Sequence, residues 1–304
     1  MMRRQLLSPM RCIVVAKYSR QMVDFKKLRA AKAQAPVVDP VEIFRRLPKP
    51  PGIADLYVSQ AEVLKEWFRR RSSERDLVIK LHTGGGKTLV GLLIAQSILN
   101  ETREPVMYLS PTVQLVEQTL AKAQEYGIPA VPYVKGESFT DQFASAKAVM
   151  VCVYHALFNG NSRFGVRGGN RAVTNCAGIV LDDAHVAFST LRDQFTLRIN
   201  RELQKDEYSE LTTMFRRDFQ EIGRAGTFDD IIGGRERDGI LEVPYWSWHV
   251  RRDQVRDLLQ RGETGKSLPW PLVRDAFEHC HMLITPSSIA ITPIFPFVEL
   301  IRLC

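Results

Sequence analysis

The residues best suited to chemistry lie at 82–88, where the sequence reads His-Thr-Gly-Gly-Gly-Lys-Thr. They follow an apolar run at 77–81, which predicts a buried strand, and they precede residues 89–99, whose apolar spacing predicts a helix. A glycine-rich turn in that position directs backbone N–H groups at a phosphate. The amine of Lys87 would then reach the β- and γ-phosphates, and the Thr88 hydroxyl would hold Mg²⁺.

This turn departs from the full phosphate-loop pattern at one position, because the pattern begins with glycine where this chain has Leu81. The alternative interpretation is a flexible glycine turn in which the Lys-Thr pair is incidental. On the first interpretation, the expected nucleotide-binding residues are Thr83, Gly84, Gly85, Gly86, Lys87 and Thr88.

A pair of carboxylates, Asp182 and Asp183, directly follows a second apolar run at 178–181. If both runs are strands of one parallel sheet, their carboxyl ends meet at one edge and the carboxylates lie beside the phosphate loop. We expect Asp182 to hold Mg²⁺, directly or through water, and Asp183 to orient an attacking water. The alternative is two surface aspartates that cap the following helix.

The elements that must position these groups are strands and helices in alternation. Continuous runs of Val, Ile and Leu between helical patterns are typical of a parallel sheet covered on both faces. The sequence therefore predicts an α/β fold with a mostly parallel sheet flanked by helices. The predicted strands are 77–81, 105–109, 130–134, 148–153 and 178–181, and the predicted helices are 61–68, 89–99 and 114–126.

The sequence changes character after Asp183. Residues 190–223 are charged with helical spacing, 224–245 are glycine-rich and loop-like, and 250–259 and 272–281 predict further helices. Aromatic and basic residues in this region could stack on bases and contact phosphates. The alternative is a helical insertion whose aromatic residues pack and whose charges are solvated. The residues concerned are Tyr245, Trp246, Trp248, Arg216, Arg217, Arg251, Arg252 and Arg256.

The composition is that of a globular chain of one large or two modest domains, with 304 residues, 45% hydrophobic and 25% charged. The formal charge is +8, and Lys and Arg outnumber Asp and Glu by 16 to 6 within residues 1–71. A basic arm there could attract nucleic acid, or it is a solvated leader. Five scattered cysteines and no apolar run of membrane length indicate a cytoplasmic protein with no membrane partner.

Together these stretches resemble the motifs of superfamily 2 helicases, above all the DEAD/DEAH-box group and the helicase subunit of type III restriction enzymes. Residues 83–88 resemble motif I, and Asp-Asp-Ala-His at 182–185 resembles motif II. Ser-Pro-Thr-Val-Gln-Leu-Val-Glu-Gln at 110–118 resembles motif Ia, and Tyr-Val-Ser-Gln at 57–60 resembles an adenine-reading glutamine motif. The likeness covers roughly residues 55–190.

The resemblance implies a RecA-like phosphate-loop domain that binds ATP and Mg²⁺ and couples hydrolysis to movement on nucleic acid. It implies that Gln60 reads adenine and that His185 senses the γ-phosphate or links to nucleic acid. It also implies that Pro111, Thr112 and Gln118 lie near the strand-binding face. DNA is favoured over RNA as the partner.

Two departures from the family pattern bear on turnover. Motif II usually has Glu where this chain has Asp183, and a carboxylate withdrawn by one methylene could slow hydrolysis about 10²-fold. After residue 185 there is no second parallel pattern and no Ser-Ala-Thr motif. We therefore expect an N-terminal half of a helicase, from a truncated reading frame or completed by a separate chain.

Three segments are expected: a basic arm and linker at 1–54, a RecA-like ATP-binding domain at 55–190, and a helical insertion with an incomplete C-terminal part at 191–304. The expected function is a nucleic-acid-dependent ATPase of the helicase or translocase type. The alternative is a nucleotide-binding interaction module or remnant without turnover. A phosphate-loop kinase would leave the motif Ia stretch and His185 unexplained.

Overall fold

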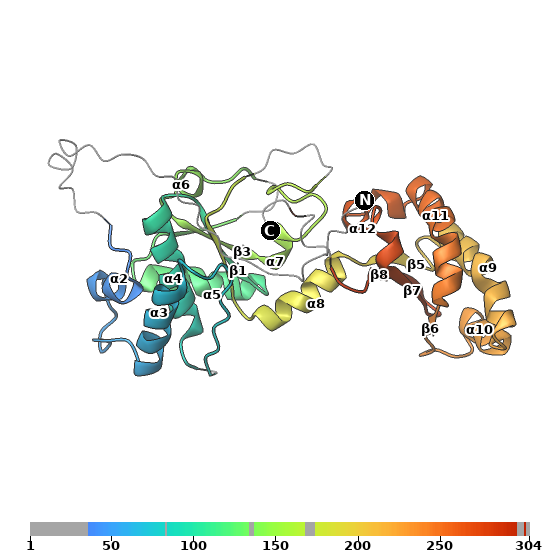
Figure 1. The fold of residues 1–304 in the computed structure, drawn as a ribbon, viewed down its shortest axis with the longest axis horizontal. Helices are drawn as coiled ribbons and strands as arrows, with labels where there is room; N and C mark the ends of the chain where they lie inside the picture. The colour runs from blue at the N-terminus through green and yellow to red at the C-terminus, as the bar shows by residue number, and fades with distance from the viewer. Residues whose placement is uncertain (1–35, 83, 134–136, 168–173, 297–300, 302–304) are drawn as a thin grey trace, which may run out of the picture. The chain divides into compact units, whose positions relative to one another are not determined.

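The computed structural model of the chain describes residues 36–82, 84–133, 137–167, 174–296 and 301 (Figure 1). Thr83, one of the expected nucleotide-binding residues, lies outside the described residues. The chain divides into two compact units. Unit 1 takes its described residues from the stretches up to Ala156 and from Thr174 to Ala184, and unit 2 takes the others.

Unit 1 contains a four-stranded sheet in the order β2-β3-β1-β4. β1 pairs in parallel with both β3 and β4, and β3 pairs in parallel with β2. The carboxyl ends of these strands therefore lie at one edge, as the apolar runs predicted. The strands are β1 (Val106–Ser110), β2 (Ala130–Pro132), β3 (Val149–Val153) and β4 (Gly178–Leu181).

The helices of unit 1 confirm the predicted alternation, and α4 is the most deeply buried of them. Every residue from Leu89 to Leu99 is buried, because this helix packs on β1 and β4 and also against α2, α3 and α5. A helix that is apolar on all sides is expected in such a position. The helices are α2 (Pro40–Arg46), α3 (Val58–Arg70), α4 (Lys87–Thr102), α5 (Val113–Glu125), α6 (Asp141–Ala144) and α7 (Tyr154–Leu157), the last of which reaches the boundary with unit 2.

Part of the expected N-terminal arm is packed into unit 1. The Asp39 side chain caps α2 by accepting hydrogen bonds from the amides of Val41 and Glu42, and Pro40 occupies the first turn. Phe44 is 1% exposed, and its ring lies 6.0 Å from that of Tyr126. Prolines, which are common in linkers, therefore begin and follow a short core helix here. Residues 1–35 of the expected arm lie outside the described residues.

The predicted strand at 77–81 is wrong, since these residues form no regular element and pair with no described strand. Leu77 and Leu81 pack against the core, whereas Val78 is 96% exposed. Apolar composition marks residues for burial, but a strand also needs a neighbour for its backbone hydrogen bonds. In the described sheet β4 is an edge strand that pairs with β1 alone.

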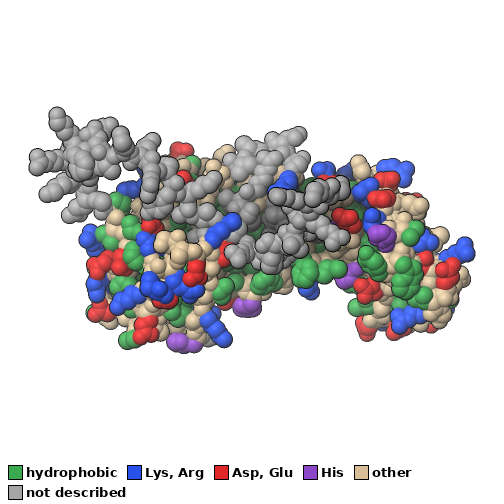
Figure 2. Space-filling model, viewed as in Figure 1, with side chains coloured by type: hydrophobic (Ala, Val, Ile, Leu, Met, Phe, Trp, Pro, Cys, Tyr) green, Lys and Arg blue, Asp and Glu red, His purple; other side chains and the backbone are tan. Residues whose placement is uncertain are grey.

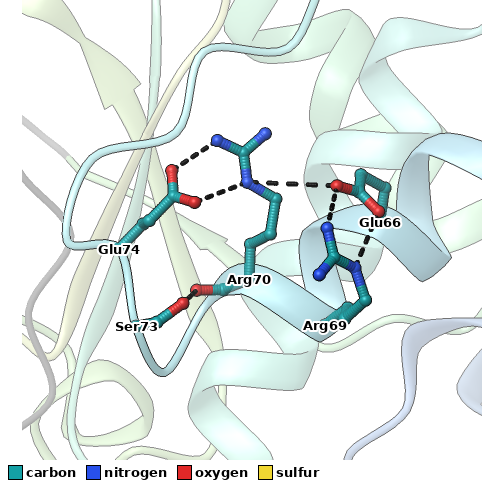
Figure 3. Close-up of polar contacts among 5 residues, drawn as sticks. All are labelled: Glu66, Arg69, Arg70, Ser73 and Glu74. Carbon is teal, nitrogen blue, oxygen red and sulfur yellow. Dashed lines mark hydrogen bonds and ion pairs between the residues drawn. The ribbon is translucent and has the colours of Figure 1, made fainter.

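Charged residues hold the chain reversal between α3 and this extended segment (Figure 3). The guanidinium of Arg70 donates to Glu74, with Nε 2.7 Å from Oε1, and Arg69 donates to Glu66. Each hydrogen bond lowers the pKa of the carboxyl that accepts it. The Ser73 hydroxyl donates to the Arg70 carbonyl at 3.0 Å. These groups lie at the surface, so they orient the turn more than they stabilise the fold.

Unit 2 joins helices to a four-stranded antiparallel sheet in the order β5-β8-β7-β6. The sequence indicated its long helices, confirmed as α9 and α11, but not this sheet. The strands are β5 (Leu197–Asn200), β6 (Leu241–Glu242), β7 (Cys280–Ile284) and β8 (Ser288–Pro293). The helices are α8 (Ala184–Gln194), α9 (Lys205–Glu221), α10 (Ala225–Ile232), α11 (Tyr245–Arg261) and α12 (Trp270–Val273), with single 3-10 turns at Thr264–Lys266 and Phe277–His279.

Three expectations for unit 2 are wrong in detail. The stretch 190–223 was expected to be helical and also contains β5. The stretch 224–245 was expected to be a loop and contains α10 and β6. The helix expected at 272–281 ends early, because residues from Cys280 onward alternate between buried and partly exposed positions in β7. A short apolar run fits a helix or a strand equally well, and tertiary pairing with β8 decided between them.

No helix in the described part of the chain combines the length and the apolar character needed to span a membrane.

The packing of α4 on the sheet depends on Gly91. A Cβ on this residue would lie 2.7 Å from Cε2 of Tyr108 and 3.3 Å from Cγ1 of Val180. Both neighbours belong to strands, and Tyr108 is 1% exposed and cannot turn away. We expect Gly91→Ala to lower the free energy of unfolding by about 1–3 kcal/mol, because overpacking outweighs the gain in helix propensity. Urea unfolding followed by circular dichroism measures this change.

The matched control is Gly226→Ala in α10, where an added Cβ meets no atom within 4 Å. This variant should be as stable as the unaltered chain or slightly more stable. Equal stability of the two variants would contradict the close approach of α4 to the sheet.

Candidate functional site

The glycine turn that was expected to be a phosphate loop leads sharply into the N-terminus of α4. Gly84 and Gly86 have φ angles of +82° and +71°, a region that glycine adopts without steric cost. The amide of Gly85 donates to the His82 carbonyl at 3.0 Å, which closes the turn. Gly86 then caps α4, so that the helix begins at Lys87 with its N-terminal amides unpaired by the helix itself. Such a helix start attracts anions.

Gln60 of α3 holds this loop from inside the unit. Its side chain is buried, with Oε1 accepting from the Tyr57 amide at 3.1 Å and Nε2 donating to the Gly85 carbonyl at 3.0 Å. A Cβ at position 86 would come within 2.2 Å of Nε2, so Gly86 is also required for this contact. One Nε2 hydrogen remains for another acceptor.

The acidic pair lies beside the loop, as the parallel arrangement predicted. The Asp182 amide donates to the Leu109 carbonyl at 2.9 Å and continues the pairing of β4 with β1. Asp183 follows at the edge of the sheet, and its Oδ1 lies 3.4 Å from Nζ of Lys87. The side chains of Lys87 and Asp183 are each more than a third exposed, so a ligand can reach them.

The backbone at Asp183 gives a physical reason for its side chain. Its φ is +51°, in the left-handed region. Aspartate and asparagine enter this region several times more often than other side chains with a Cβ, because their short polar groups can bond locally. A glutamate here would have a longer reach but would fit the turn less well. The shorter carboxylate therefore suits the conformation that brings it to Lys87.

Two tyrosines support the acidic pair, and the sequence interpretation did not single them out. The hydroxyl of Tyr108 of β1 interacts with the side chains of both Thr88 and Asp182. Burial raises its pKa well above the ordinary value, and the charge of Asp182 adds to this. The Tyr154 hydroxyl donates to the Asp182 carbonyl. A tyrosine within an aliphatic buried strand was the available signal, because its hydroxyl must find a partner.

Burial raises the pKa of Asp182, and the neighbouring Asp183 charge raises it further. The hydrogen bond from Tyr108 and the charge of Lys87 oppose the shift without cancelling it. A cation bound next to Asp182 would therefore stabilise the charged form of this carboxylate. Its oxygen and the Thr88 hydroxyl are hard oxygen donors of the kind that Mg²⁺ takes, so the residues fit that ion.

The motif Ia residues lie where β1 ends and α5 begins. The Thr112 hydroxyl oxygen accepts from the Leu115 amide at 3.2 Å and caps α5. Pro111 is partly exposed, and Thr112 and Gln118 are exposed. Since β1 is parallel to β4, this surface belongs to the sheet edge that carries the acidic pair.

His185 is exposed near the start of α8, where the second stretch of unit 2 begins. No group of three or more His, Cys, Asp or Glu side chains in the described residues could hold a metal ion by itself. The closely spaced His279, Cys280 and His281 therefore do not form such a cluster.

Comparison with known proteins supports one family. The DEAD/DEAH box helicase model matches residues 57–222. A search of curated proteins found no match. Among solved structures, the chain is similar to Xpd4 of S. tokodaii, with 17% identity and a TM-score of 0.47. That likeness covers 80% of this chain and 53% of the other, so this chain spans about half the length of the protein it matches.

The raised pKa of Asp182 predicts that the free energy of unfolding depends on pH. Between the ordinary aspartate pKa of 3.8 and the higher folded value, the native state holds more protons than the unfolded state. Stability therefore falls as pH rises through this window, and the loss persists at neutral pH. We expect Asp182→Asn to raise the free energy of unfolding at neutral pH without Mg²⁺, and this advantage to shrink below pH 3.8.

Urea unfolding of both proteins across this pH range measures the difference. Asp193→Asn is the control, since that carboxylate is exposed beside Arg198. A destabilised Asp182→Asn variant at neutral pH would mean that the carboxylate is better compensated than its surroundings indicate.

Proposed function

Because this chain belongs to the DEAD/DEAH box helicase family, we propose that unit 1 is an ATP-binding domain that couples ATP hydrolysis to the binding or remodelling of nucleic acid. The observation that carries the proposal is the 3.4 Å contact between Lys87 and Asp183. It brings a phosphate-loop lysine and a motif II carboxylate together from positions far apart in the sequence. Single-stranded or double-stranded DNA is the preferred partner, and RNA is the second choice.

In the proposed mechanism the loop amides and Lys87 bind the β- and γ-phosphates of ATP. Thr88 and Asp182 would hold Mg²⁺, and the ion would supply charge neutralisation at the phosphate oxygens. Tyr108, whose hydroxyl interacts with both side chains, would help to keep these oxygen donors in place. Asp183 orients the attacking water and accepts its proton.

The Lys87–Asp183 contact suggests how binding prepares the site. In the nucleotide-free chain the ammonium and the carboxylate partly neutralise each other. Phosphate groups compete for Lys87, because they offer it several anionic oxygens. The carboxylate of Asp183 then loses its partner and becomes free to bind water. Turnover is thereby linked to an occupied phosphate loop.

Nucleic acid would contact the exposed surface at Pro111, Thr112 and Gln118, and His185 would sense the γ-phosphate or link to the strand. The described part of unit 2 has an antiparallel sheet and not a second parallel one. We propose that a separate chain supplies the second RecA-like domain that the family uses. An arginine from such a domain can add about 10³–10⁵ in rate.

The second candidate function is a nucleotide-binding interaction module without turnover. The short Asp183 carboxylate favours it, since withdrawal of the base by one methylene slows water attack. Steady-state ATP hydrolysis by the chain separates the two functions, measured alone and with single- and double-stranded DNA and RNA. Turnover that increases with one polymer supports the ATPase. ATP binding without turnover in any mixture supports the interaction module.

Lys87→Ala tests the phosphate loop. We expect ATP affinity to fall about 10- to 100-fold, because a charged hydrogen-bond donor to the phosphates is lost. Equilibrium binding of a fluorescent ATP analogue measures it. The control is Lys122→Ala in α5, an exposed lysine that pairs with Glu125. Unchanged ATP affinity of Lys87→Ala would contradict the phosphate-loop assignment.

Asp183→Asn tests the catalytic carboxylate with little disturbance of the backbone, because asparagine also accepts a positive φ. We expect ATP affinity to be retained or increased, since Lys87 loses its internal partner. We expect turnover to fall at least about 10²-fold. Single-turnover hydrolysis measures the chemical step, and equal rates in the two proteins would remove Asp183 from the mechanism.

Gln60→Ala separates adenine recognition from support of the loop. If the free Nε2 hydrogen bonds to adenine, the variant should lose more affinity for ATP than for GTP. If Gln60 only holds the Gly85 carbonyl, both nucleotides should weaken equally. We expect the unequal loss, and competition binding with the two nucleotides measures it.

A further inference from the structure

The N-terminal part of α11 presents aromatic rings to solvent. Tyr245 is 67% exposed and Trp246 is 61% exposed, although both are large apolar side chains. Two residues further on, Trp248 is 1% exposed, and its Nε1 donates to the Phe277 carbonyl at 2.9 Å. The expectation that Trp248 could stack on a base is therefore wrong, since its ring belongs to the core of unit 2. Tyr245 and Trp246 have no such internal role.

Planar groups continue from Tyr245 along the same face of α11. The His249 ring lies 5.8 Å from the Tyr245 ring, and its Nδ1 lies 2.6 Å from Nη1 of Arg252. These residues follow the i, i+4, i+7 spacing of one helix face. We call Tyr245, Trp246, His249 and Arg252 the α11 stripe. In Figure 2 hydrophobic and histidine side chains gather over the part of unit 2 that contains α11 and β7.

The arginines of unit 2 differ in their availability. Arg251 donates to Asp218, Arg216 to Asp229 and Arg217 to Glu221. Arg256 pairs with Asp253. Among the described residues, Arg252 and Arg224 have no carboxylate partner. Arg167, Arg192, Arg201, Arg237 and Arg261 of unit 2 also have no carboxylate partner among the described residues. Of these arginines, Arg252 belongs to the α11 stripe, and Arg224, at the start of α10, lines the cavity beside it.

A cavity of about 570 Å³ adjoins the stripe, which is within the usual range for ligand sites. Its lining combines aromatic walls with one guanidinium and the two carboxylates of Glu242 and Glu278. The Glu242 carboxylate lies 2.9 Å from Nδ1 of His281, which holds it at the rim. A carboxylate of this kind accepts hydrogen bonds from the exocyclic amine of a base. The residues used here are Arg224, Glu242, Tyr245, Trp246, His281 and Ile294.

We propose that the α11 stripe and its cavity bind an unpaired base of a single-stranded nucleic acid. Tyr245 and Trp246 stack on the base, Glu242 accepts from its amine, and Arg224 and Arg252 contact the flanking phosphates. Aromatic faces interleaved with unpaired cations are the common arrangement for single strands, because every base has a stacking face. The choice of nucleic acid as the ligand rests on the proposed function of unit 1.

The tryptophans of this chain allow a direct test. The chain has four, and Trp67, Trp248 and Trp270 are all at most 5% exposed. Trp246 is therefore the tryptophan most accessible to a bound base, although Trp248 also lines the cavity. The full chain is titrated without nucleotide with a short mixed-sequence single-stranded DNA and with the matching RNA, and tryptophan emission is followed. We expect quenching by at least one strand, and loss of that quenching in Trp246→Ala.

The affinity for the same strands, measured by anisotropy of a labelled oligonucleotide, should fall about 5- to 100-fold in Trp246→Ala and in Tyr245→Ala. Leu203→Ala is the control for loss of an exposed apolar side chain, since Leu203 is 83% exposed outside the stripe. Arg217→Gln is the control for Arg252→Gln, because its guanidinium is already paired. Both controls should bind as the unaltered chain does.

Two comparisons make the result decisive. A strand of the same length that lacks its bases should bind weakly and without quenching, because it offers charge but no stacking face. Lys87→Ala, tested without nucleotide, should keep the quenching even if it abolishes ATP binding, so failure of the proposed function is recognised separately. Unchanged emission on strand binding, or equal affinity of Trp246→Ala, would overturn the inference and favour a protein ligand for this surface.

Discussion

The parallel pairing of β1 with β4 is the constraint on which the rest of unit 1 depends. It places Asp182 and Asp183 at the edge of the sheet to which α4 brings its N-terminus, so the lysine and the carboxylates meet without any local sequence connection. Gly91 permits this arrangement, because a side chain there would collide with Tyr108 and push the helix away. The chemistry of the site is thus a consequence of how closely one helix can lie on two strands.

The negative charge on Asp182 is unfavourable in the folded protein. Asp182 is partly desolvated beside a second carboxylate, and the internal compensation from Tyr108 and Lys87 is incomplete. Such a site is poised to accept positive charge at Asp182 and negative charge at Lys87, which is the charge distribution of a magnesium nucleotide. The left-handed backbone at Asp183 belongs to the same design, since it turns the carboxylate toward the loop while favouring the shorter of the two acidic side chains.

Unit 2 divides its aromatic residues between two roles. Trp248, Trp270 and Phe277 form a buried aromatic group, with ring centroids of Trp248 and Phe277 5.7 Å apart. Tyr245 and Trp246 precede Trp248 on α11 and remain outside the core. Exposed aromatic rings leave apolar surface in contact with water, which is typical of a binding surface.

The sequence by itself indicated the glycine turn before a helix, the acidic pair after a strand, a mostly parallel sheet and the family. These features follow from local rules. Glycine allows a positive φ, the spacing of apolar residues indicates burial, and functional side chains follow the ends of strands. Only the tertiary structure decided that 77–81 has no strand partner, that Pro40–Arg46 packs as a helix, and that β7 is a strand. It also decided that Tyr108 links Thr88 to Asp182, and which tryptophan faces solvent. These outcomes depend on which distant residues are neighbours, and periodicity along one chain does not contain that information.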